Sequence, residues 1–449
     1  MPLLAALSLA HAGDPVPTVI VDIHDIGHAA VESLRRHHDV RWSAEFGNEL
    51  LLGVGEEALP AWLNRTDVRL GPPRLAFDEV VVRDHACPRH DQAPALTVVG
   101  GFEILRRPPP LARALSPALG IGRPLPADGV VSREVRNSVG GKQARVVEGG
   151  LQASVSRVDG MRWFTTMSEL AAFDRNSFSS GIHTSHDWIL AHFEGLGLDT
   201  GSHAFTLGGS GCASPQPQPV GLHNPYALRP GDGRAHEWIV IGAHYDSRNQ
   251  VRCDGGANPQ PGANDNASGC AGVIELARVF ARVPTERSLL FICFAGEEQG
   301  LAGSYRFVEF LIDSGDIDRV QHMINLDMIG HAVDSRLDAR VETNSANAGL
   351  LLEYAAMAAT YAPELNLITS STTQAYSDHW PFLAAGVPSV FTWENGAGIY
   401  PYWHHVDDVP ANMQFARELA SGILKMDAAM LAQRAGSLAV FFGDFEARE

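Results

Sequence analysis

The sequence predicts an α/β protein with a mixed, largely parallel twisted central sheet flanked by helices, preceded by a small α+β domain. Three observations predict this fold class. The chain has 449 residues, which is too long for one ordinary domain. Hydrophobic residues make up 45% and charged residues 19%, as in a globular protein with a large core. From Met167 onward, apolar runs typical of buried strands alternate with helix-like patterns.

The N-terminus has the pattern of a secretory signal peptide. An apolar run from Leu3 to Ala10 ends in Ala10-His11-Ala12, which matches the small-x-small cleavage pattern. The run is much shorter than the roughly 20 residues that a membrane-spanning helix needs. We therefore expect residues 1–12 to be a signal peptide and the protein to be exported, either to the periplasm or out of the cell.

Residues 18–104 are expected to form a small α+β domain. The patterns follow the order strand, helix, strand, strand, helix, strand, which is typical of the ferredoxin-like fold. The expected elements are strand 18–23, helix 29–36, strands 40–46 and 48–54, helix 58–63 and strand 68–71. Residues 78–104 add further strand-like runs.

A change in composition separates this domain from the rest of the chain. Residues 105–126 are rich in Pro, Gly and Ala and show no sustained period, which is typical of a linker. We place a linker region at 105–160 and a larger α/β domain at 161–449. The expected elements of the larger domain include helix 185–196, strand 237–247, helix 268–280, strand 289–296, helix 303–311 and strand 322–330.

Polar side chains gather where these strands end. In an open α/β sheet, ligands bind at the edge formed by the carboxyl ends of the strands. The residues at or after these ends, with those of a later Pro-rich loop, are His244, Asp246, Asp265, Glu297, Glu298, Asp327, His404, His405, Asp407 and Asp408. Carboxylates and imidazoles at one edge would repel one another or lack partners unless a cation holds them. The sequence therefore predicts a metal site there.

The donor types indicate which metal the site would hold. Imidazole nitrogen and carboxylate oxygen, without a CxxC pair, suit zinc in a hydrolytic role. An odd number of carboxylates leaves one free to bridge, which suits a two-metal centre. Glu297 and Glu298 are adjacent, and neighbours in a strand-like segment point to opposite sides. We expect Glu298 to bind metal and Glu297 to face the water that the metal activates.

Over roughly residues 165–435, the chain resembles the cocatalytic dizinc aminopeptidases of peptidase family M28. The matching stretches are GAHYDS, PGANDNASG, AGEEQGLAGS, NLDMIG, YSDHWPFLAAGVPSV and His404 with Asp408. The resemblance implies the zinc exopeptidase fold and two Zn²⁺ ions per chain, which share a bridging water. It also implies hydrolysis of N-terminal residues from peptides that have a free N-terminus.

The resemblance also implies a set of ligands and a base. The implied ligands are His244, Asp265, Glu298, Asp327 and His404. Asp265 would bridge the metals, and Glu297 would be the general base and then the general acid. Glu298 and His404 would complete one site, and the other ligands the second.

Four further residues are implied to support this centre. Asp246 would hold the imidazole of His244 and fix its tautomer. Asp378 and Asp408 would support the site without binding metal. Tyr376 is a candidate oxyanion donor, with packing over the pocket mouth as the alternative. In the family the peptide bond after the bridging carboxylate is cis, so we expect the same of Asp265–Asn266.

One stretch departs from the family pattern. Many members read Tyr-His-Thr at the last ligand, whereas this chain reads Trp403-His404-His405. The four-residue step to Asp408 favours His404, and the adjacent His405 is the alternative. A Trp-His pair also resembles the glutaminyl cyclases, which share the fold and use one zinc, so a cyclase is the nearest alternative function. A non-catalytic binding module is a third hypothesis, although every ligand position is filled.

The five cysteines fit an exported protein. Cys212 and Cys253 lie in Gly-, Pro- and Ser-rich loops flanking the strand that ends in His244, and they are the best disulfide candidates. Cys270 and Cys293 lie in apolar patterns and are expected to be buried thiols. Cys87 is left over.

Charge and domain order bear on partners. The formal net charge is −18 and no basic stripe occurs, so no nucleic-acid partner is expected. Small domains like 18–104 precede many exported proteases as folding aids or temporary inhibitors. We therefore expect this domain to be a prosegment or, alternatively, a permanent accessory domain.

Overall fold

The computed structural model describes residues 14–23, 28–47, 49–84, 96–99, 102–106, 123–124, 130–134, 149–209, 212, 217–251, 253, 258–372, 377–394 and 400–437. The chain divides into two compact units. Unit 1 consists of Met1–Arg136 and Ser370–Gln374, and unit 2 of Asn137–Thr369 and Ala375–Glu449. The expected signal peptide and most of the expected linker lie outside the described residues, so both stay predictions.

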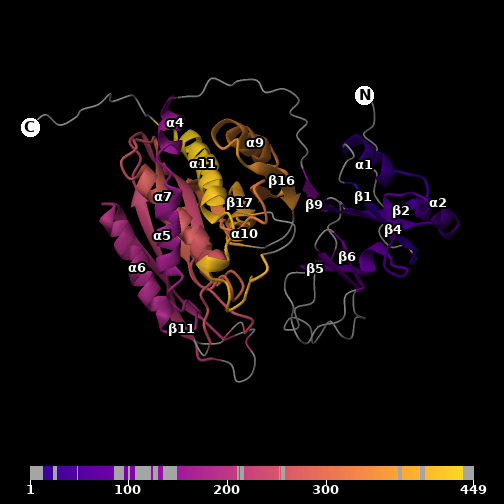
Figure 1. Ribbon diagram of the computed structural model, residues 1–449, viewed down its shortest axis with the longest axis horizontal. Helices are drawn as coiled ribbons and strands as arrows, with labels where there is room; N and C mark the ends of the chain where they lie inside the picture. Colours follow the sequence, from indigo (N-terminus) through magenta and orange to yellow (C-terminus); the bar gives the residue numbers. More distant parts are fainter. Residues whose placement is uncertain are drawn as a thin grey trace, which may run out of the picture. The chain divides into compact units, whose positions relative to one another are not determined.

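Unit 1 contains the ferredoxin-like arrangement that the sequence predicts (Figure 1). Its first elements are β1 (Thr18–Asp22), α1 (His28–Arg35), β2 (Val40–Gly47), β3 (Glu49–Val54), α2 (Leu59–Leu63) and β4 (Val68–Leu70). They form a sheet in the order β9-β2-β3-β1-β4, in which β9 (Val130–Glu134) runs parallel to β2 and the other pairs are antiparallel. The small α+β part of the predicted fold class is confirmed.

Alternating apolar residues build the core of unit 1. Val19 and Val21 of β1 lie opposite Leu52 and Leu50 of β3. All four are buried in one cluster with Val31 of α1, because every second side chain of a strand faces the same side. A second antiparallel sheet has the order β6-β7-β5-β8. Its strands are β5 (Val80–Asp84), β6 (Thr97–Val99), β7 (Phe102–Arg106) and β8 (Arg123–Pro124).

The sheet of unit 2 is mixed, with a parallel centre. Its strands are β10 (Asp199–Leu207), β11 (Val220–Arg229), β12 (Arg234–His244), β13 (Arg287–Phe294), β14 (Val320–Leu326), β15 (Asp338–Thr343), β16 (Asn366–Thr372) and β17 (Ser389–Glu394). Their order is β10-β11-β13-β12-β14-β17-β15-β16. Strands β13, β12, β14 and β17 are parallel, whereas β10, β11 and β15 pair antiparallel. This confirms the predicted sheet.

Helices cover both faces of this sheet (Figure 1). They are α4 (Gly149–Val155), α5 (Gly160–Leu170), α6 (Gly181–Gly195), α7 (Ser268–Phe280), α8 (Ala302–Ser314), α9 (Gly349–Tyr361), α10 (His379–Ala384) and α11 (Ala416–Ala435). Phe294 of β13 packs in one cluster with Phe307 of α8 and Phe382 of α10. Its neighbour Cys293 points to the opposite face and is bonded to Cys270 of α7. Helices α7 and α8 therefore lie on opposite faces. Among the described residues, no helix is long and apolar enough to cross a membrane.

The cysteines form two disulfides in the structure. Cys212 is paired with Cys253, with their Cα atoms 5.7 Å apart. Two strands, β11 and β12, separate them along the chain, not the single strand that the sequence indicates. Cys270 is paired with Cys293, with their Cα atoms 6.0 Å apart. The interpretation of this second pair as thiols was therefore wrong. Both positions are buried as expected, and they meet because α7 packs directly on β13.

A free-thiol count checks both disulfides. Protein denatured without reductant should expose one thiol per chain, because two disulfides occupy four of the five cysteines. The remaining cysteine, Cys87, lies outside the described residues. A count of three would leave only one disulfide, and a count of five would contradict both.

Asp427 should make the stability of the protein depend on pH. This residue of α11 is fully buried, and burial raises its pKa well above the usual value, although a hydrogen bond from Thr392 Oγ1 at 3.4 Å opposes the shift. The unfolded chain keeps the ordinary pKa. The stability contributed by the neutral carboxyl is therefore complete below that value and is lost as pH rises through the folded-state pKa.

Replacing Asp427 with Asn should remove this loss. The Tm of the variant relative to the parent should rise by about 2 °C or more between pH 4 and pH 8, since one pKa unit corresponds to about 1.4 kcal/mol. Calorimetry at both pH values measures the effect. A Tm difference that does not change with pH would contradict the prediction.

Candidate metal centre

The structure brings together the five residues expected to bind metal. They come from successive elements of unit 2: His244 ends β12, Asp265 precedes α7, Glu298 follows β13, Asp327 follows β14 and His404 lies in a late turn. Because β12, β13 and β14 are parallel neighbours, their carboxyl ends share one edge. Helix α7 reaches this edge because Gly269 has no Cβ, which would collide with the Leu326 carbonyl oxygen.

The five residues form two overlapping groups with Asp265 in common. The first is His244, Asp265 and Asp327, and the second is Asp265, Glu298 and His404. Asp265 Oδ1 lies 3.2 Å from His244 Nε2, while its Oδ2 lies 3.1 Å from His404 Nε2. One carboxylate thus presents one oxygen to each group, which is the geometry that a bridging ligand needs.

Each group is completed by a second carboxylate. Asp327 Oδ1 lies 3.4 Å from His244 Nε2, and Glu298 Oε2 lies 3.1 Å from His404 Nε2. Asp327 Oδ1 is buried and accepts no hydrogen bond from the described residues. An acceptor of this kind is costly unless a cation or donor meets it, so its position fits a metal ligand.

Charge in the centre also favours a cation. Burial by itself lowers the pKa of His244, but the carboxylates of Asp327 and Glu297 and the bonds to Asp246 and Asp265 raise it well above its usual value. The negative charge of these carboxylates therefore favours the presence of positive charge at this edge of the sheet. Protons on the imidazoles or bound divalent cations can supply it. The donors are nitrogen and oxygen throughout, which suits zinc.

Glu297 and Glu298 face different partners, as the sequence indicates. Gly296 adopts φ 72°, a left-handed conformation that turns the chain sharply after β13. Glu298 then reaches His404, whereas Glu297 Oε2 lies 4.0 Å from His244 Nε2. Burial raises the pKa of Glu297 well above its usual value; the charge of His244 opposes this, and nearby carboxylates add to it. A carboxyl with a raised pKa is suited to general base catalysis near neutral pH.

His404, not its neighbour His405, joins the centre. The Trp403 ring stacks on the imidazole of His404, with ring centroids 3.7 Å apart and planes 26° apart, and so orients it. His405 Nδ1 instead lies 3.2 Å from Asp407 Oδ2. The spacing of four residues to Asp408 favours His404, and His404 is the histidine that lies among the carboxylates in the structure.

Asp246 has a broader role than the expected one. Its Oδ1 lies 3.5 Å from His244 Nδ1, but its backbone carbonyl oxygen is closer to the same atom, at 3.1 Å. The carboxylate also accepts the backbone N–H of Glu297 at 3.1 Å and that of Glu298 at 3.3 Å. Asp246 therefore connects the His244 turn to the turn that carries both glutamates.

Asp408 supports the loop that carries Asp265. Its two carboxylate oxygens accept the backbone N–H groups of Asn264 at 2.8 Å and Asp265 at 2.9 Å. Burial raises the pKa of Asp408 to about 7, although these two hydrogen bonds lower it. The Asp265–Asn266 peptide bond is cis, which confirms the expectation.

Asp378 is also buried near the centre. Burial raises its pKa to about 7, the charge of His244 opposes the rise, and those of Asp327 and Asp246 add to it. Tyr376 lies outside the described residues, so its role as an oxyanion donor stays a prediction.

Sequence reasoning missed three polar residues that support the ligands. Ser377 donates a hydrogen bond to Asp327 Oδ2 at 2.6 Å. The Asn266 side chain donates to Leu326 O and accepts from Met328 N–H, and so grips both neighbours of Asp327. Asn264 donates to Glu394 Oε1 and accepts from Gly330 N–H. The only sequence signal for the two asparagines is that they flank Asp265.

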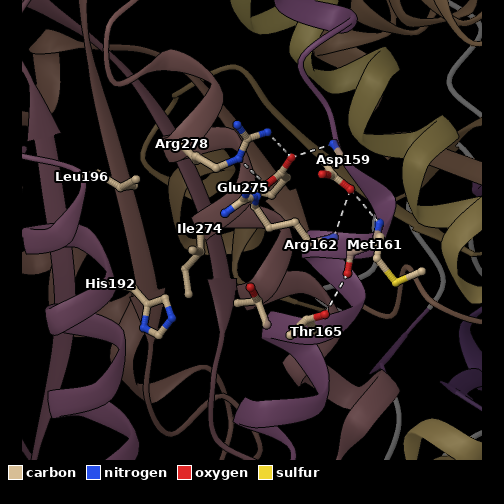
Figure 2. Close-up of a pocket in the computed structure, with 10 residues that line it drawn as sticks. Asp159, Met161, Arg162, Thr165, His192, Leu196, Ile274, Glu275 and Arg278 are labelled. Atoms are coloured by element: carbon tan, nitrogen blue, oxygen red, sulfur yellow. Dashed lines mark hydrogen bonds and ion pairs between the residues drawn. The ribbon is translucent and has the colours of Figure 1, made fainter.

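The pocket in Figure 2 lies elsewhere, among α5, α6 and α7, and none of the predicted site residues lines it. Three of its charged residues, Asp159, Glu275 and Arg278, have partners. Arg278 Nη2 lies 2.6 Å from Glu275 Oε1, which also accepts the backbone N–H of Asp159 at 2.7 Å. The Asp159 carboxylate accepts the backbone N–H groups of Met161 and Arg162 at the start of α5. These bonds join α5 to α7, so we assign the cluster a structural role.

The chain is similar in sequence to known peptidases. Residues 226–424 match the model of peptidase family M28. Over 193 residues the chain is 32% identical to aminopeptidase YwaD of Bacillus subtilis, covering 42% of this chain and 38% of that protein. Over 203 residues it is 34% identical to a probable zinc metalloprotease of Pyricularia oryzae, covering 43% and 40%. The chain thus spans about two fifths of the length of these curated relatives.

The fold is also found in solved structures. The LapA aminopeptidase of Legionella pneumophila aligns over 94% of this chain and 100% of its own, with a TM-score of 0.54 and 18% identity. BSAP, a zinc aminopeptidase from Bacillus subtilis, aligns over 62% and 95%, with a TM-score of 0.53 and 18% identity. At such identities these likenesses show the shared fold alone. The chain is therefore similar to peptidase family M28 over residues 226–424, and it shares its fold with these solved aminopeptidases.

Proposed function

We propose that this protein is a zinc-dependent aminopeptidase that removes N-terminal residues from peptides. The observation that carries the proposal is the pair of donor groups that share Asp265, with Glu297 beside them. Two relatives support zinc and aminopeptidase activity by their names, aminopeptidase YwaD and a probable zinc metalloprotease. We also propose two zinc ions per chain, because each group of three donors can hold one ion.

The residues of the chain divide the work between binding and proton transfer. The ligands would be His244, Asp265, Glu298, Asp327 and His404. When bound, zinc lowers the pKa of a coordinated water and polarises the scissile carbonyl. Glu297 would take a proton from the attacking water and pass it to the leaving amine. The same carboxyl must accept and then release a proton, and its position 4.0 Å from His244 Nε2, outside both donor groups, leaves it free to do so.

The surrounding residues keep this arrangement rigid. Asp246 holds both the His244 turn and the backbone of Glu297 and Glu298. Asp408 holds the backbone of Asp265 in the same way. We further propose that Tyr376 donates a hydrogen bond to the developing oxyanion.

One experiment separates this proposal from its alternatives. The full-length protein should hydrolyse several aminoacyl-anilides and contain about two zinc ions per chain in the same sample, as two-metal hydrolases do. One zinc ion per chain at saturation, with cyclisation of an N-terminal glutamine on the peptide and release of ammonia, would identify a glutaminyl cyclase. No turnover of any substrate and no zinc would indicate a binding module.

We propose that the protein is exported and that residues 1–12 are its signal peptide. The support is the small-x-small pattern after the apolar run. N-terminal sequencing of mature protein should begin at or near Gly13. Protein that retains Met1 after export would contradict this cleavage site.

We propose the division into an N-terminal domain (18–104), a linker region (105–160) and a peptidase domain (161–449). Within the linker region, β9 belongs to unit 1 and α4 belongs to unit 2. Two roles for the first domain remain to be separated by limited proteolysis in the Pro-rich segment. A prosegment should lower activity while attached, so the fragment beyond about residue 105 should be more active. An accessory domain should change specificity or stability on removal without raising the rate. Full-length protein that gains nothing from proteolysis would rule out the inhibitory role.

A further inference from the structure

Between α5 and α6 lies a buried segment with polar side chains that bond to the loops carrying His244 and Asp265. We call Arg175, Asn176 and Ser177 the support segment. Arg175 and Asn176 are fully buried and Ser177 is 1% exposed. A run of polar side chains is seldom buried unless each finds partners, so their partners indicate what the segment does.

Arg175 binds backbone carbonyl groups from three parts of the chain. Its Nε donates to Tyr245 O at 2.7 Å, and its Nη2 donates to Gly262 O at 2.7 Å. Its Nη1 donates to Pro261 O at 2.8 Å and to Leu170 O at 2.9 Å. Tyr245 directly follows His244, and the Pro261–Gly262 pair lies just before Asp265. One guanidinium therefore ties together the two loops that carry these ligands.

The charge of Arg175 is not used in a close ion pair. No carboxylate of the described residues lies within ion-pair distance of its guanidinium, and its hydrogen bonds all go to neutral carbonyls. Burial lowers its pKa to about 10, while Asp408, Asp246 and Asp265 oppose this shift, so Arg175 stays protonated at neutral pH. The planar guanidinium of a buried arginine can hold several backbone carbonyl groups in fixed relative positions.

The other two residues reach the same loops. Ser177 Oγ donates to Asp246 Oδ2 at 3.1 Å, the oxygen that also accepts the Glu298 backbone N–H. Asn176 Nδ2 donates to Gln260 Oε1 at 2.7 Å. The Arg175 carbonyl accepts the backbone N–H of Ser247 at 3.1 Å. These links run to residues 245–247 and 260–262, while Arg175 also donates to Leu170 O and Phe173 O on its own side.

We propose that Arg175 and Ser177 are positioning residues of the metal centre, because they set the separation and orientation of the His244 turn and the Asp265 loop. Arg175 holds both loops by their backbones, and Ser177 holds the Asp246 carboxylate that braces the turn with Glu297. The inference rests on the proposed zinc centre. It adds to that proposal a set of residues far from it in sequence that controls its affinity for zinc.

The zinc affinity of full-length variants tests this proposal. It is measured by titrating zinc, as the only added metal, in competition with a chelator. Ser177→Ala should bind zinc about 10-fold more weakly, at the low end of the loss seen when an outer partner of a ligand is removed, because Ser177 acts through Asp246, which holds the ligand His244. Ser179→Ala is the matched control. It removes a hydroxyl just after the support segment, but Ser179 Oγ donates to the Asp174 carbonyl and not to residues 245–247 or 260–262. Its zinc affinity should stay within about twofold of the parent.

A second readout separates positioning from general stability. The Tm of the metal-depleted Ser177→Ala and Ser179→Ala variants should fall by similar amounts, because each loses one hydrogen bond. In the active protein, Ser177→Ala should lower kcat more than it changes KM, because Glu297 shares the Asp246 brace. Equal zinc affinities for the two serine variants would overturn the proposal.

Arg175→Lys tests whether the fork or the charge matters. Lys keeps the positive charge but cannot donate in the planar pattern that reaches carbonyl groups from three parts of the chain at once. We expect weaker zinc binding in this variant, by about 10-fold or more. Parent-like affinity would show that charge alone suffices and would overturn the role of Arg175. If Arg175→Lys does not fold, the serine pair decides the proposal. A parent protein that binds no zinc would refute the zinc centre itself, which is a distinguishable outcome.

Discussion

Glu297→Gln should lower kcat by about 10²- to 10⁴-fold, the usual contribution of a general base. Zinc content should stay near two ions per chain, because Glu297 belongs to neither donor group and its Oε2 lies 4.0 Å from His244 Nε2. Gln has nearly the same shape as Glu, but it cannot accept the proton of the attacking water. Stopped assays on an aminoacyl-anilide, with metal analysis of the same sample, measure both quantities.

Two results would contradict the role of Glu297. Unchanged turnover would mean that another group is the base or that the protein is not a hydrolase. Loss of zinc together with activity would mean that Glu297 is a ligand. Glu309→Gln is a suitable control, since Glu309 lies on the surface of α8, 56% exposed and paired with Arg306. That variant should behave like the parent in both measurements.

Glu298→Gln should lose zinc as well as activity. Glu298 Oε2 lies 3.1 Å from His404 Nε2 in the group that also contains Asp265. A neutral amide is a much weaker zinc donor than a carboxylate, so zinc content should fall toward one ion per chain. The affinity of this site should fall by more than about 100-fold, because loss of an outer partner alone costs about 10–100-fold.

Comparison of the two glutamate variants gives the sharpest result. Zinc titration of the metal-depleted proteins should show two binding events for Glu297→Gln and one strong event for Glu298→Gln. If both variants lost the same amount of zinc, the division of labour between these adjacent residues would be wrong. If both retained two ions and full activity, the centre itself would lie elsewhere.

Residue patterns were sufficient to predict most of the regular elements, because burial imposes a period. The run from Leu289 to Phe294 is apolar at every position, as in a strand buried on both faces, and the structure has β13 at Arg287–Phe294. Helix 268–280 was predicted by its 3.6-residue period and is α7. In unit 1 the order of patterns was enough for the ferredoxin-like arrangement.

Strand β11 shows where pattern reasoning fails. It contains Pro225 and the polar residues His223 and Asn224, so it lacks a clear apolar run. It pairs with β10 on one side and with β13 on the other. Because β13 lies far from β11 in the sequence, no local pattern reveals this pairing. For this reason the sequence indicated one strand between Cys212 and Cys253, and the structure has two.

The sequence by itself determined which residues could form the candidate metal centre. Donors such as His244 and Asp327 stand at the ends of buried strands, and the ends of parallel strands must share an edge. Only the tertiary structure decided what holds them there. Ser177 lies 69 positions from Asp246, and Cys270 lies 23 positions from Cys293. Such contacts leave no local pattern, because hydrogen bonds and disulfides depend on which surfaces the packing of helices on the sheet brings within reach.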